Sequence, residues 1–487
     1  MSQRNENQKE RGEFTAKDLQ ESQVAQIAVS SEDDNYIRRA FDRRMLPIVC
    51  TLYILSYVDR GNIGNARTAG ADLDLGLSSS QWAWVLNSFY IGYVLFEWGT
   101  LFWKMFPAHI FVAILCVLWG AVAMCSGVVK NMAGLVACRL LLGIFEAIFG
   151  AGAPFFLSLF YQRRELAFRI ALLVGMSPVA NCFAGALAYG ITHIKGTSLE
   201  PWRLLFLIEG APTVLFAPVV FFFLPDSPSQ ATFLPERLRP MAVDRLQTRD
   251  RSDKRHINWK HILEGLTDYR NVMHTFIHFM CNFSFAALSN FMPSIVQGMG
   301  YSSINAQGLT APMYLLAFIL CVLSAWFSDR YGHRGIVISV FSLVGMTGYL
   351  ILATLTDATK PGGRYVGALL AACGAFPALC LNVTWLLNNN SSDSKRGAGL
   401  AILLVFGQCS SFLSSTVFPR SDGPFYVKGT AIGCGFTGSI AVFALAIYFR
   451  LRHINKKRDA EFGPVSVDAQ VDVTEQGDNH PSYRYVL

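Results

Sequence analysis

The stretch LYILSYVDRGNIGNAR, residues 52–67, is apolar enough in its first half for a membrane helix and charged in its second half. Asp59 and Arg60 are adjacent, and Asn62 and Asn65 follow them. Placing one charged side chain at the centre of a bilayer costs roughly 2.5–3.5 kcal/mol on insertion scales. A segment that keeps such residues predicts a membrane helix whose charged side chains serve a function.

The composition of the whole chain also indicates a membrane protein. Of its 487 residues, 52% are hydrophobic and 15% are charged, and the mean hydropathy is +0.34. Soluble domains average about 25% charged residues. Four windows contain no Asp, Glu, Lys or Arg over about 20 residues, enough to cross a hydrocarbon core of about 30 Å: 110–129, 336–356, 397–419 and 429–449.

When single embedded charges are allowed, the sequence predicts an all-α membrane protein with twelve transmembrane helices in two six-helix bundles. The predicted spans lie near 45–65, 82–103, 108–128, 132–158, 168–192, 203–224, 272–297, 308–328, 336–356, 365–387, 397–419 and 429–449. Two bundles around a central site are the usual plan of a carrier that faces each side of a membrane in turn.

Basic residues set the predicted topology. An even number of spans leaves both termini on one side, and the Lys and Arg residues that flank the first and last spans place that side in the cytosol. We therefore predict a disordered cytosolic tail at 1–44, an N-terminal bundle at 45–224, a cytosolic linker with an interfacial helix at 225–271, a C-terminal bundle at 272–451 and a cytosolic tail at 452–487. The formal net charge of +7 is interpreted as a topology signal, and no nucleic-acid partner is expected.

Four ionisable residues form the candidate site of the first bundle. On the first span, Tyr57 and Arg60 share one stripe of the helix, and Asp59 lies about 100° away on the next. On the fourth span, Arg139 and Glu146 are seven residues apart and share a face. An anion that binds an arginine takes that cation away from a neighbouring carboxylate and so favours protonation of the carboxylate. Mutual salt bridges that only hold helices together are the alternative interpretation.

The second bundle is poorer in charge. Its candidates are Asn282, Asn290, Asn382, Trp385 and Gln408, of which Asn282, Asn382 and Gln408 are the predicted substrate contacts; each could instead be an interhelical hydrogen bond. His274 and His278 have the i, i+4 spacing of metal ligands, but no third ligand is nearby in the sequence. Neither a metal site nor a cofactor is therefore expected.

Several motifs together are similar to the major facilitator superfamily, and within it to the fungal anion:cation symporter branch of allantoate, nicotinate and pantothenate permeases. They are DRGNIGNAR at 59–67, RLLLGIFEA at 139–147, WRLLFLIEG at 202–210, LPDSP at 224–228 and SDRYGHRG at 328–335. The resemblance implies that Asp59 and Glu146 take protons and that Arg60 and Arg139 manage the anion. It also implies that Tyr57 lines the site.

The resemblance extends to a cytoplasmic gate. It implies that Asp329 caps a helix and that Arg330 and Arg334 bridge it in one conformation. One departure is the sequence WGTLFWK after Glu97, where the branch usually has Pro and Asn. We therefore expect the second helix to bend less than in the branch.

The function predicted from these features is proton-coupled symport of a small organic anion, such as a vitamin-like or sugar-acid carboxylate, by alternating access. Export of an acidic secondary metabolite or toxin is an alternative, and a nutrient sensor on a transporter fold is a further one. An enzyme is not expected, because the nine His residues are dispersed and no nucleophile lies beside a base. The expected partners are the anion, protons and the lipid bilayer of the plasma membrane, and the protein is expected to be monomeric and multi-pass.

Overall fold

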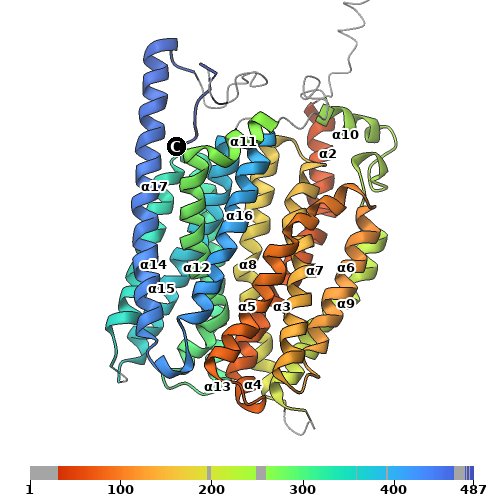
Figure 1. Cartoon of the computed structure of the whole chain (residues 1–487). Coiled ribbons are helices and arrows are strands. Elements are labelled where there is room, and N and C mark those ends of the chain that lie inside the picture. Colours follow the sequence, from red (N-terminus) through yellow and green to blue (C-terminus); the bar gives the residue numbers. More distant parts are fainter. Residues whose placement is uncertain are drawn as a thin grey trace, which may run out of the picture.

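The computed structural model describes residues 31–194, 199–247, 259–357, 359–390, 393–465, 478, 480–481 and 483–487. Within these ranges the chain is helical and contains no strand. Figure 1 shows long, roughly parallel helices, with α2 (Ser31–Arg44), α10 (Leu238–Gln247) and α11 (Trp259–Thr267) gathered at one end. That end, which also holds the C-terminus, is here named the termini end, and the opposite end, where α4 (Ala71–Asp74) lies, the far end.

Local sequence signals explain where the long helices of the first half begin. Pro47 occupies the first turn of the first long helix, and Ser78 and Gln81 form a capping box at the start of the second. Gly70 has φ of 96° and turns the chain after the first helix. The helices are α3 (Leu46–Thr68), α5 (Ser79–Phe96) continued by the 3₁₀ helix η1 (Glu97–Lys104), α6 (Ala108–Cys125), α7 (Met132–Ser158), α8 (Arg163–Thr192) and α9 (Pro201–Phe223).

The second half repeats this arrangement. The Asp268 side chain caps its first helix by accepting a hydrogen bond from the backbone N–H of Arg270, and Gly332, with φ of 67°, ends its second. The helices are α12 (Tyr269–Gln297), α13 (Ser303–Tyr331), α14 (Arg334–Thr354), α15 (Pro361–Asn389), α16 (Asp393–Thr416) and α17 (Val427–Phe462). All twelve predicted spans therefore coincide with described helices, within a few residues at most boundaries.

Small residues allow these helices to approach closely. A Cβ atom on Gly143 of α7 would lie 2.1 Å from the backbone oxygen of Phe89 in α5, and one on Gly374 of α15 would lie 2.2 Å from the backbone nitrogen of Gly345 in α14. Neither position tolerates a side chain. Close backbone contact of this kind is the main source of helix association where lipid is the solvent.

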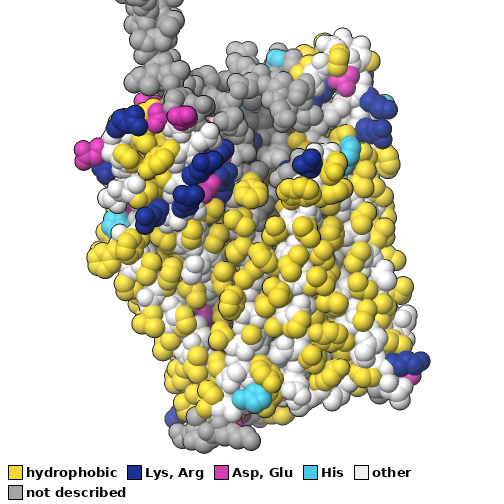
Figure 2. All heavy atoms as spheres, turned by 180° about the vertical axis from the view of Figure 1, so that it is seen from behind, with side chains coloured by type: hydrophobic (Ala, Val, Ile, Leu, Met, Phe, Trp, Pro, Cys, Tyr) yellow, Lys and Arg dark blue, Asp and Glu magenta, His cyan; other side chains and the backbone are white. Residues whose placement is uncertain are grey.

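Ten of the described helices are long and apolar enough to cross a membrane. They are α6 to α9 and α12 to α17, whereas α3 and α5 lie outside this set. Figure 2 shows a broad band of hydrophobic side chains on the face in view, with most Lys and Arg above it at the termini end. The chain is thus a multi-pass membrane protein, and the full count of twelve crossings and the cytosolic position of the termini stay predictions.

The segment between the halves is divided between them. Leu234 and Leu238 are almost fully buried against the first half, beside α2. By contrast, α11 packs on α16, where a Cβ on Gly265 would lie 2.7 Å from the backbone oxygen of Lys395. Leu263 and Leu266 of α11 are exposed, as an interfacial helix requires, and that role stays a prediction.

The prediction of a disordered tail over 1–44 was wrong for its last fourteen residues, because residues 31–44 form α2. Residues 1–30 lie outside the described residues. Ile37, Phe41 and Met45 recur every four residues and are fully buried, so α2 is held in place by packing of its apolar face. A helix whose mean composition is polar can still be ordered when that one face is covered.

Two features add to the predictions. The last helix continues beyond the predicted bundle boundary at 451 to Phe462, and the final residues 483–487 lie against the second half, with Tyr485 buried. In the second long helix, α5 gives way to the 3₁₀ helix η1 at Glu97, and the smaller bend expected there stays a prediction. The tighter winding accompanies a hydrogen bond of 2.8 Å from Trp103 Nε1 to the backbone oxygen of Ile148 in α7.

Candidate functional site

The two charged residues at the centre of α3 are buried and face different neighbours. Asp59 is 1% and Arg60 6% exposed. Because consecutive residues of a helix are about 100° apart, their side chains diverge: Arg60 reaches Glu146 on α7, and Asp59 reaches Thr213 on α9. The first half therefore has two polar contacts around one helix.

The first contact is an ion pair. Arg60 donates to Glu146 Oε2 from Nε at 3.3 Å and from Nη2 at 3.2 Å. Ser56, one helical turn before Arg60, donates to the same oxygen at 3.1 Å. The second oxygen of Glu146, Oε1, accepts no hydrogen bond within the described residues. Glu146 thus holds one oxygen in a pair and keeps the other without a partner.

Aromatic rings enclose the cation of this pair. The guanidinium carbon of Arg60 lies 4.6 Å from the ring centroid of Tyr57, 5.0 Å from that of Phe89 and 4.8 Å from that of Tyr93. Rings at this distance attract a cation and exclude water from it. Tyr57 in turn meets the ring of Phe285 on α12 edge to face at 5.6 Å, which connects the cluster to the second half.

Arg139, the second predicted arginine, makes different contacts from Arg60. Arg139 and Glu146 do lie on the same helix face, yet Glu146 pairs with Arg60. Arg139 donates from Nη1 to the backbone oxygen of Arg60 at 3.4 Å, and within the described residues its Nε and Nη2 have no hydrogen-bond partner. A buried guanidinium with two unmatched donors can bind an anion.

The second contact includes an acid to which the sequence assigned no site role. Thr213 Oγ1 donates to Asp59 Oδ2 at 2.9 Å. Glu209 lies one turn before Thr213 on the same face of α9 and is 1% exposed. Within the described residues neither oxygen of Glu209 has a hydrogen-bond partner, and Asp59 Oδ1 has none. Asp59 and Glu209 are therefore two buried acids on adjacent helices.

The second half contributes an amide cluster at a matching depth. Asn282 Nδ2 contacts the backbone oxygen of Gly407 at 2.9 Å, Gln408 Oε1 at 3.3 Å and Ser411 Oγ at 3.2 Å. Asn282 lies 13 residues into α12 and Arg60 lies 14 residues into α3, so each is about 20 Å from the termini-end start of its helix.

Asn382 does not join this cluster. Its Oδ1 is 2.8 Å from His274 Nδ1, and its Nδ2 donates to the backbone oxygen of His274 at 3.0 Å. His274 precedes Asn282 by eight residues on α12, which places Asn382 about 12 Å closer to the termini end. His278 also lies in α12, and no group of three His, Cys, Asp or Glu residues suited to a metal ion occurs in the part of the chain that the structure describes.

The two halves also meet between the buried charges and the far end. Asn290 Nδ2 of α12 donates to the hydroxyl of Tyr90 on α5 at 3.0 Å, and Asn181 of α8 donates to Ser289 Oγ at 3.2 Å. A Cβ on Gly64 of α3 would lie 2.5 Å from the backbone oxygen of Asn290. This contact is close enough that movement of one half past the other must separate it.

At the far end, charged groups join the halves. Asp72 Oδ2 of α4 lies 3.5 Å from Arg67 Nε in the same half and 2.7 Å from Nη1 of Arg420 in the other half. Gln307 donates to the backbone oxygen of Asn65 at 3.2 Å, also between halves. The far end is thus closed by polar contacts in this conformation.

The residues of the predicted gate lie at the termini end. Arg334 begins α14 and is buried, and its backbone N–H donates to the oxygen of Leu487 at 2.5 Å. Arg330 is exposed, with its guanidinium 5.7 Å from the ring centroid of Trp326. Asp329 lies in α13, but its side chain is outside the described set. Arg334 therefore contacts the C-terminal tail, which the gate prediction did not include.

Sequence reasoning missed several residues that surround the four buried ionisable residues of the first half. Phe89, Tyr90 and Tyr93 of α5 were not singled out, although Tyr90 and Tyr93 lie three residues apart in an apolar span. Thr213 was also missed. A polar residue one turn from an embedded acid, as Thr213 is from Glu209, is the signal that could have found it.

Comparisons with known proteins agree on the class of molecule. A family model described as Major Facilitator Superfamily matches residues 49–415. The major facilitator-type transporter hxnP of Emericella nidulans is 31% identical over 474 residues, 95% of each chain. The high-affinity nicotinic acid transporter of Saccharomyces cerevisiae is 29% identical over 459 residues, 92% of this chain and 84% of that protein. These relatives are named as transporters, which confirms that the chain is not an enzyme.

Solved structures share the fold. The proton:xylose symporter XylE bound to 6-bromo-6-deoxy-D-glucose has a TM-score of 0.65 at 16% identity, covering 89% of this chain and 97% of that one. A bacterial homologue of the human lysosomal transporter Spinster has a TM-score of 0.62 at 16% identity, covering 86% and 97%. At this identity the likeness concerns the arrangement of helices alone.

Proposed function

The chain belongs to the major facilitator superfamily, and on that premise we propose that it is a proton-coupled symporter of a small organic anion that works by alternating access. The observation that carries the proposal is the buried Arg60–Glu146 pair with one unpartnered carboxylate oxygen, beside a second arginine with unmatched donors. An apolar contact would hold the helices at lower cost, since buried ion pairs rarely repay their desolvation as stability.

The proposed coupling is an exchange of partners on Arg60. The carboxylate of the substrate accepts hydrogen bonds from Arg60 in place of Glu146 Oε2, and Glu146, left without its cation, takes up a proton. Arg139 donates additional hydrogen bonds to the substrate carboxylate from Nε and Nη2, which have no partner within the described residues. One proton and one anion then move together, so the charge carried by the loaded site equals that of the empty one.

Asp59 is proposed as the second proton site. It is held by Thr213 through one oxygen only and faces α9, about 100° around α3 from Arg60. Release of the substrate restores the Arg60–Glu146 pair and expels the proton from Glu146. Asp59 then provides a carboxylate that can exchange protons without competing for Arg60.

We propose a flat aromatic monocarboxylate as the substrate class. The rings of Tyr57, Phe89 and Tyr93 surround the guanidinium that would hold the carboxylate. The amide cluster of Asn282 and Gln408 lies at the same depth in the other half and can bind a ring nitrogen or hydroxyl. The name of the yeast relative, a nicotinic acid transporter, supports this class.

The far-end contacts suggest the cycle. Because Asp72 is joined to Arg420 at the far end, we propose that the site opens toward the termini end, which the basic loops predict to be cytosolic. Binding from outside then requires that the far-end contacts break and that contacts form between the halves at the termini end. We propose the plasma membrane as its location and a monomer as the working unit.

The proposal is tested by uptake of a labelled carboxylate panel into proteoliposomes under an imposed inward proton gradient. We expect at least one aromatic monocarboxylate to accumulate, Asp59→Asn to abolish accumulation but retain exchange, and Arg60→Gln to abolish both. Asp357→Asn, in an exposed loop at the far end, is the matched control and should transport normally. Accumulation only under the opposite gradient would favour export, and normal uptake by both site variants would overturn the assigned roles.

A further inference from the structure

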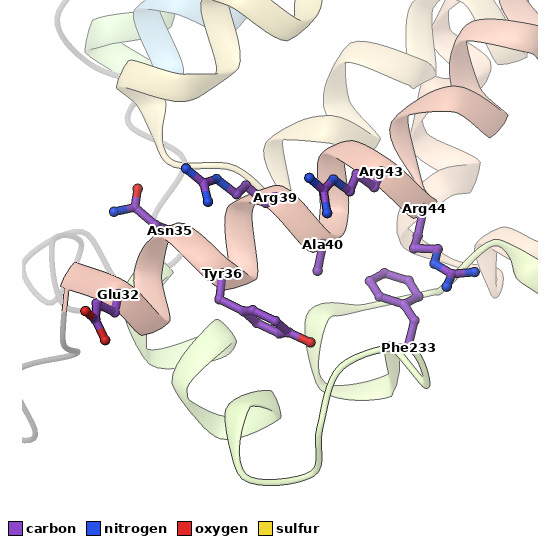
Figure 3. Close-up of a pocket in the computed structure, with 8 residues that line it drawn as sticks. All are labelled: Glu32, Asn35, Tyr36, Arg39, Ala40, Arg43, Arg44 and Phe233. Atoms are coloured by element: carbon purple, nitrogen blue, oxygen red, sulfur yellow. The ribbon is translucent and has the colours of Figure 1, made fainter.

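A separate pocket of about 510 Å³ lies on the surface at the termini end, away from the buried charges. Figure 3 shows that it is formed along one side of α2 and closed by Phe233, which comes from the segment after η2 (Pro228–Gln230). Its lining residues are Glu32, Asn35, Tyr36, Arg39, Ala40, Arg43, Arg44 and Phe233.

The acids of α2 that could neutralise this pocket are used on other faces of the helix. Asp34 pairs with Arg245 at 2.9 Å, and Asp42 pairs with Arg169. Asp33 likewise pairs with Arg237, the residue just before α10, at 3.3 Å. These bonds fasten α2 to the first half and to the linker.

The arginines of the pocket have no such partners. Arg39, Arg43 and Arg44 are exposed, and within the described residues no carboxylate forms an ion pair with any of them. Glu32 is the one acidic residue of the lining, and Figure 3 places it at the opposite end of the pocket from Arg44. Three arginines and one glutamate leave the pocket with a formal charge of +2.

The floor of the pocket is apolar and anchored. The ring of Phe233 meets that of Phe41 edge to face at 5.9 Å, and Phe41 is fully buried in the first half. Tyr36 stands at the rim with 51% of its surface exposed. In Figure 3 Arg44 lies beside the ring of Phe233, so at this end of the pocket a guanidinium group borders a fixed aromatic side chain.

The position of the pocket indicates its ligand. Arg44 lies two residues before Leu46, where the first long helix begins. Figure 2 shows basic side chains gathered over the α2 and α10 region immediately above the hydrophobic band. That is the level of lipid headgroups, and guanidinium groups bind phosphate oxygens in a bidentate manner.

We propose that this pocket binds the phosphate-bearing headgroup of an anionic membrane lipid. The phosphate binds to the guanidinium groups of Arg39, Arg43 and Arg44, and the acyl chains extend toward the hydrophobic band. A lipid held there ties α2 to the linker, the covalent connection between the two halves.

The test uses the full-length protein in detergent micelles and measures retained lipid by native mass spectrometry after titration with phosphatidylinositol 4-phosphate. The variant Arg39→Gln, Arg43→Gln, Arg44→Gln is compared with a matched triple on α17, Arg450→Gln, Arg452→Gln, Lys456→Gln. The α17 residues are exposed, lie near the same end and carry the same total charge. Melting temperatures without lipid check that both variants are folded.

We expect the pocket variant to bind the lipid at least tenfold more weakly and the α17 variant to change binding less than twofold. Equal losses in the two variants would show a non-specific charge effect and overturn the proposal. No loss in either variant would also overturn it. A third arm adds inositol 1,4-bisphosphate, the soluble headgroup, at the same concentration as the lipid. If this soluble anion binds as strongly as phosphatidylinositol 4-phosphate and displaces it, a lipid is rejected as the ligand.

Discussion

Arg60 and Glu146 form an ion pair that uses one carboxylate oxygen only: Nε and Nη2 of Arg60 both donate to Oε2, at 3.3 and 3.2 Å. A full bidentate pair would use both oxygens. Glu146 Oε1 is left without a partner within the described residues, and so is available to a proton. The pair is therefore built in a way that permits it to be opened by a competing carboxylate.

The pair predicts a non-additive mutant cycle. Arg60→Gln should abolish uptake and destabilise the protein by about 3–5 kcal/mol, because it leaves Glu146 as an unpaired buried charge. Adding Glu146→Gln should recover most of the stability but none of the uptake. Thermal melts in detergent and uptake assays measure the two effects, and additive losses of stability would contradict the cycle.

Glu209 predicts a separation of stability from coupling. Gln has the shape of a neutral carboxyl group but cannot release a proton, and neither oxygen of Glu209 has a partner within the described residues that the change would disturb. We expect the free energy of unfolding of Glu209→Gln to lie within about 1 kcal/mol of that of the parent protein, since no buried charge pair is broken. Its pH profile of uptake should shift, because Asp59 lies on the adjacent helix. An unchanged pH profile would show that Glu209 takes no part in proton coupling.

The far-end contact predicts a shift in conformation. Asp72→Asn removes the charge that joins Arg67 and Arg420, so the far end should open more often. Spin labels at Leu73 and Lys360, both exposed, report the distance between the halves. We expect a longer-distance population in the variant that is absent from the parent protein, including at high salt, because salt screens charge pairs with a buried partner much less than exposed ones. Identical distance distributions in the variant and the parent protein would show that Asp72 does not keep the far end closed.

The docked C-terminus predicts a loss of stability on truncation. Trp385 Nε1 donates to the backbone oxygen of Val486 at 2.8 Å, and Tyr485 is 2% exposed. Burying one such side chain contributes about 1.5–3 kcal/mol. Deletion of residues 483–487 should therefore lower the melting temperature, and Tyr485→Ala should reproduce much of the loss while Tyr485→Phe does not. A deletion that melts like the parent protein would show that the tail adds no stability.

Asp268 predicts a pH dependence near the termini end. Burial raises the pKa of its carboxyl, but hydrogen bonds and charge from Arg270 and Lys395 outweigh burial and lower the pKa to about 2. A pKa below the unfolded value means that the stabilisation is complete above about pH 4 and is lost as the pH falls toward 2. The difference in melting temperature between the parent protein and Asp268→Asn should thus stay constant above about pH 4 and shrink as the pH falls from about 4 toward 2. A difference that stays constant over this lower range would contradict it.

Much of the fold could be predicted from hydrophobic length. A chain in lipid must satisfy its backbone hydrogen bonds within each segment, so apolar windows of about 20 residues become helices whatever their neighbours are. That is why all twelve predicted spans coincide with described helices. The same rule failed at α2 and at the tail, where one buried face or a few backbone hydrogen bonds, rather than overall composition, determine order.

For the site, the sequence by itself determined which ionisable residues are embedded, because each charge in an apolar window needs a partner or a function. Helical periodicity also placed Asp59 and Arg60 on different faces. Only the tertiary structure decided that Glu146 pairs with Arg60 rather than with Arg139, and that Glu209 lies beside the Thr213–Asp59 contact. These choices depend on the rotation and axial position of helices far apart in the chain, which close backbone packing sets and a one-dimensional pattern does not contain.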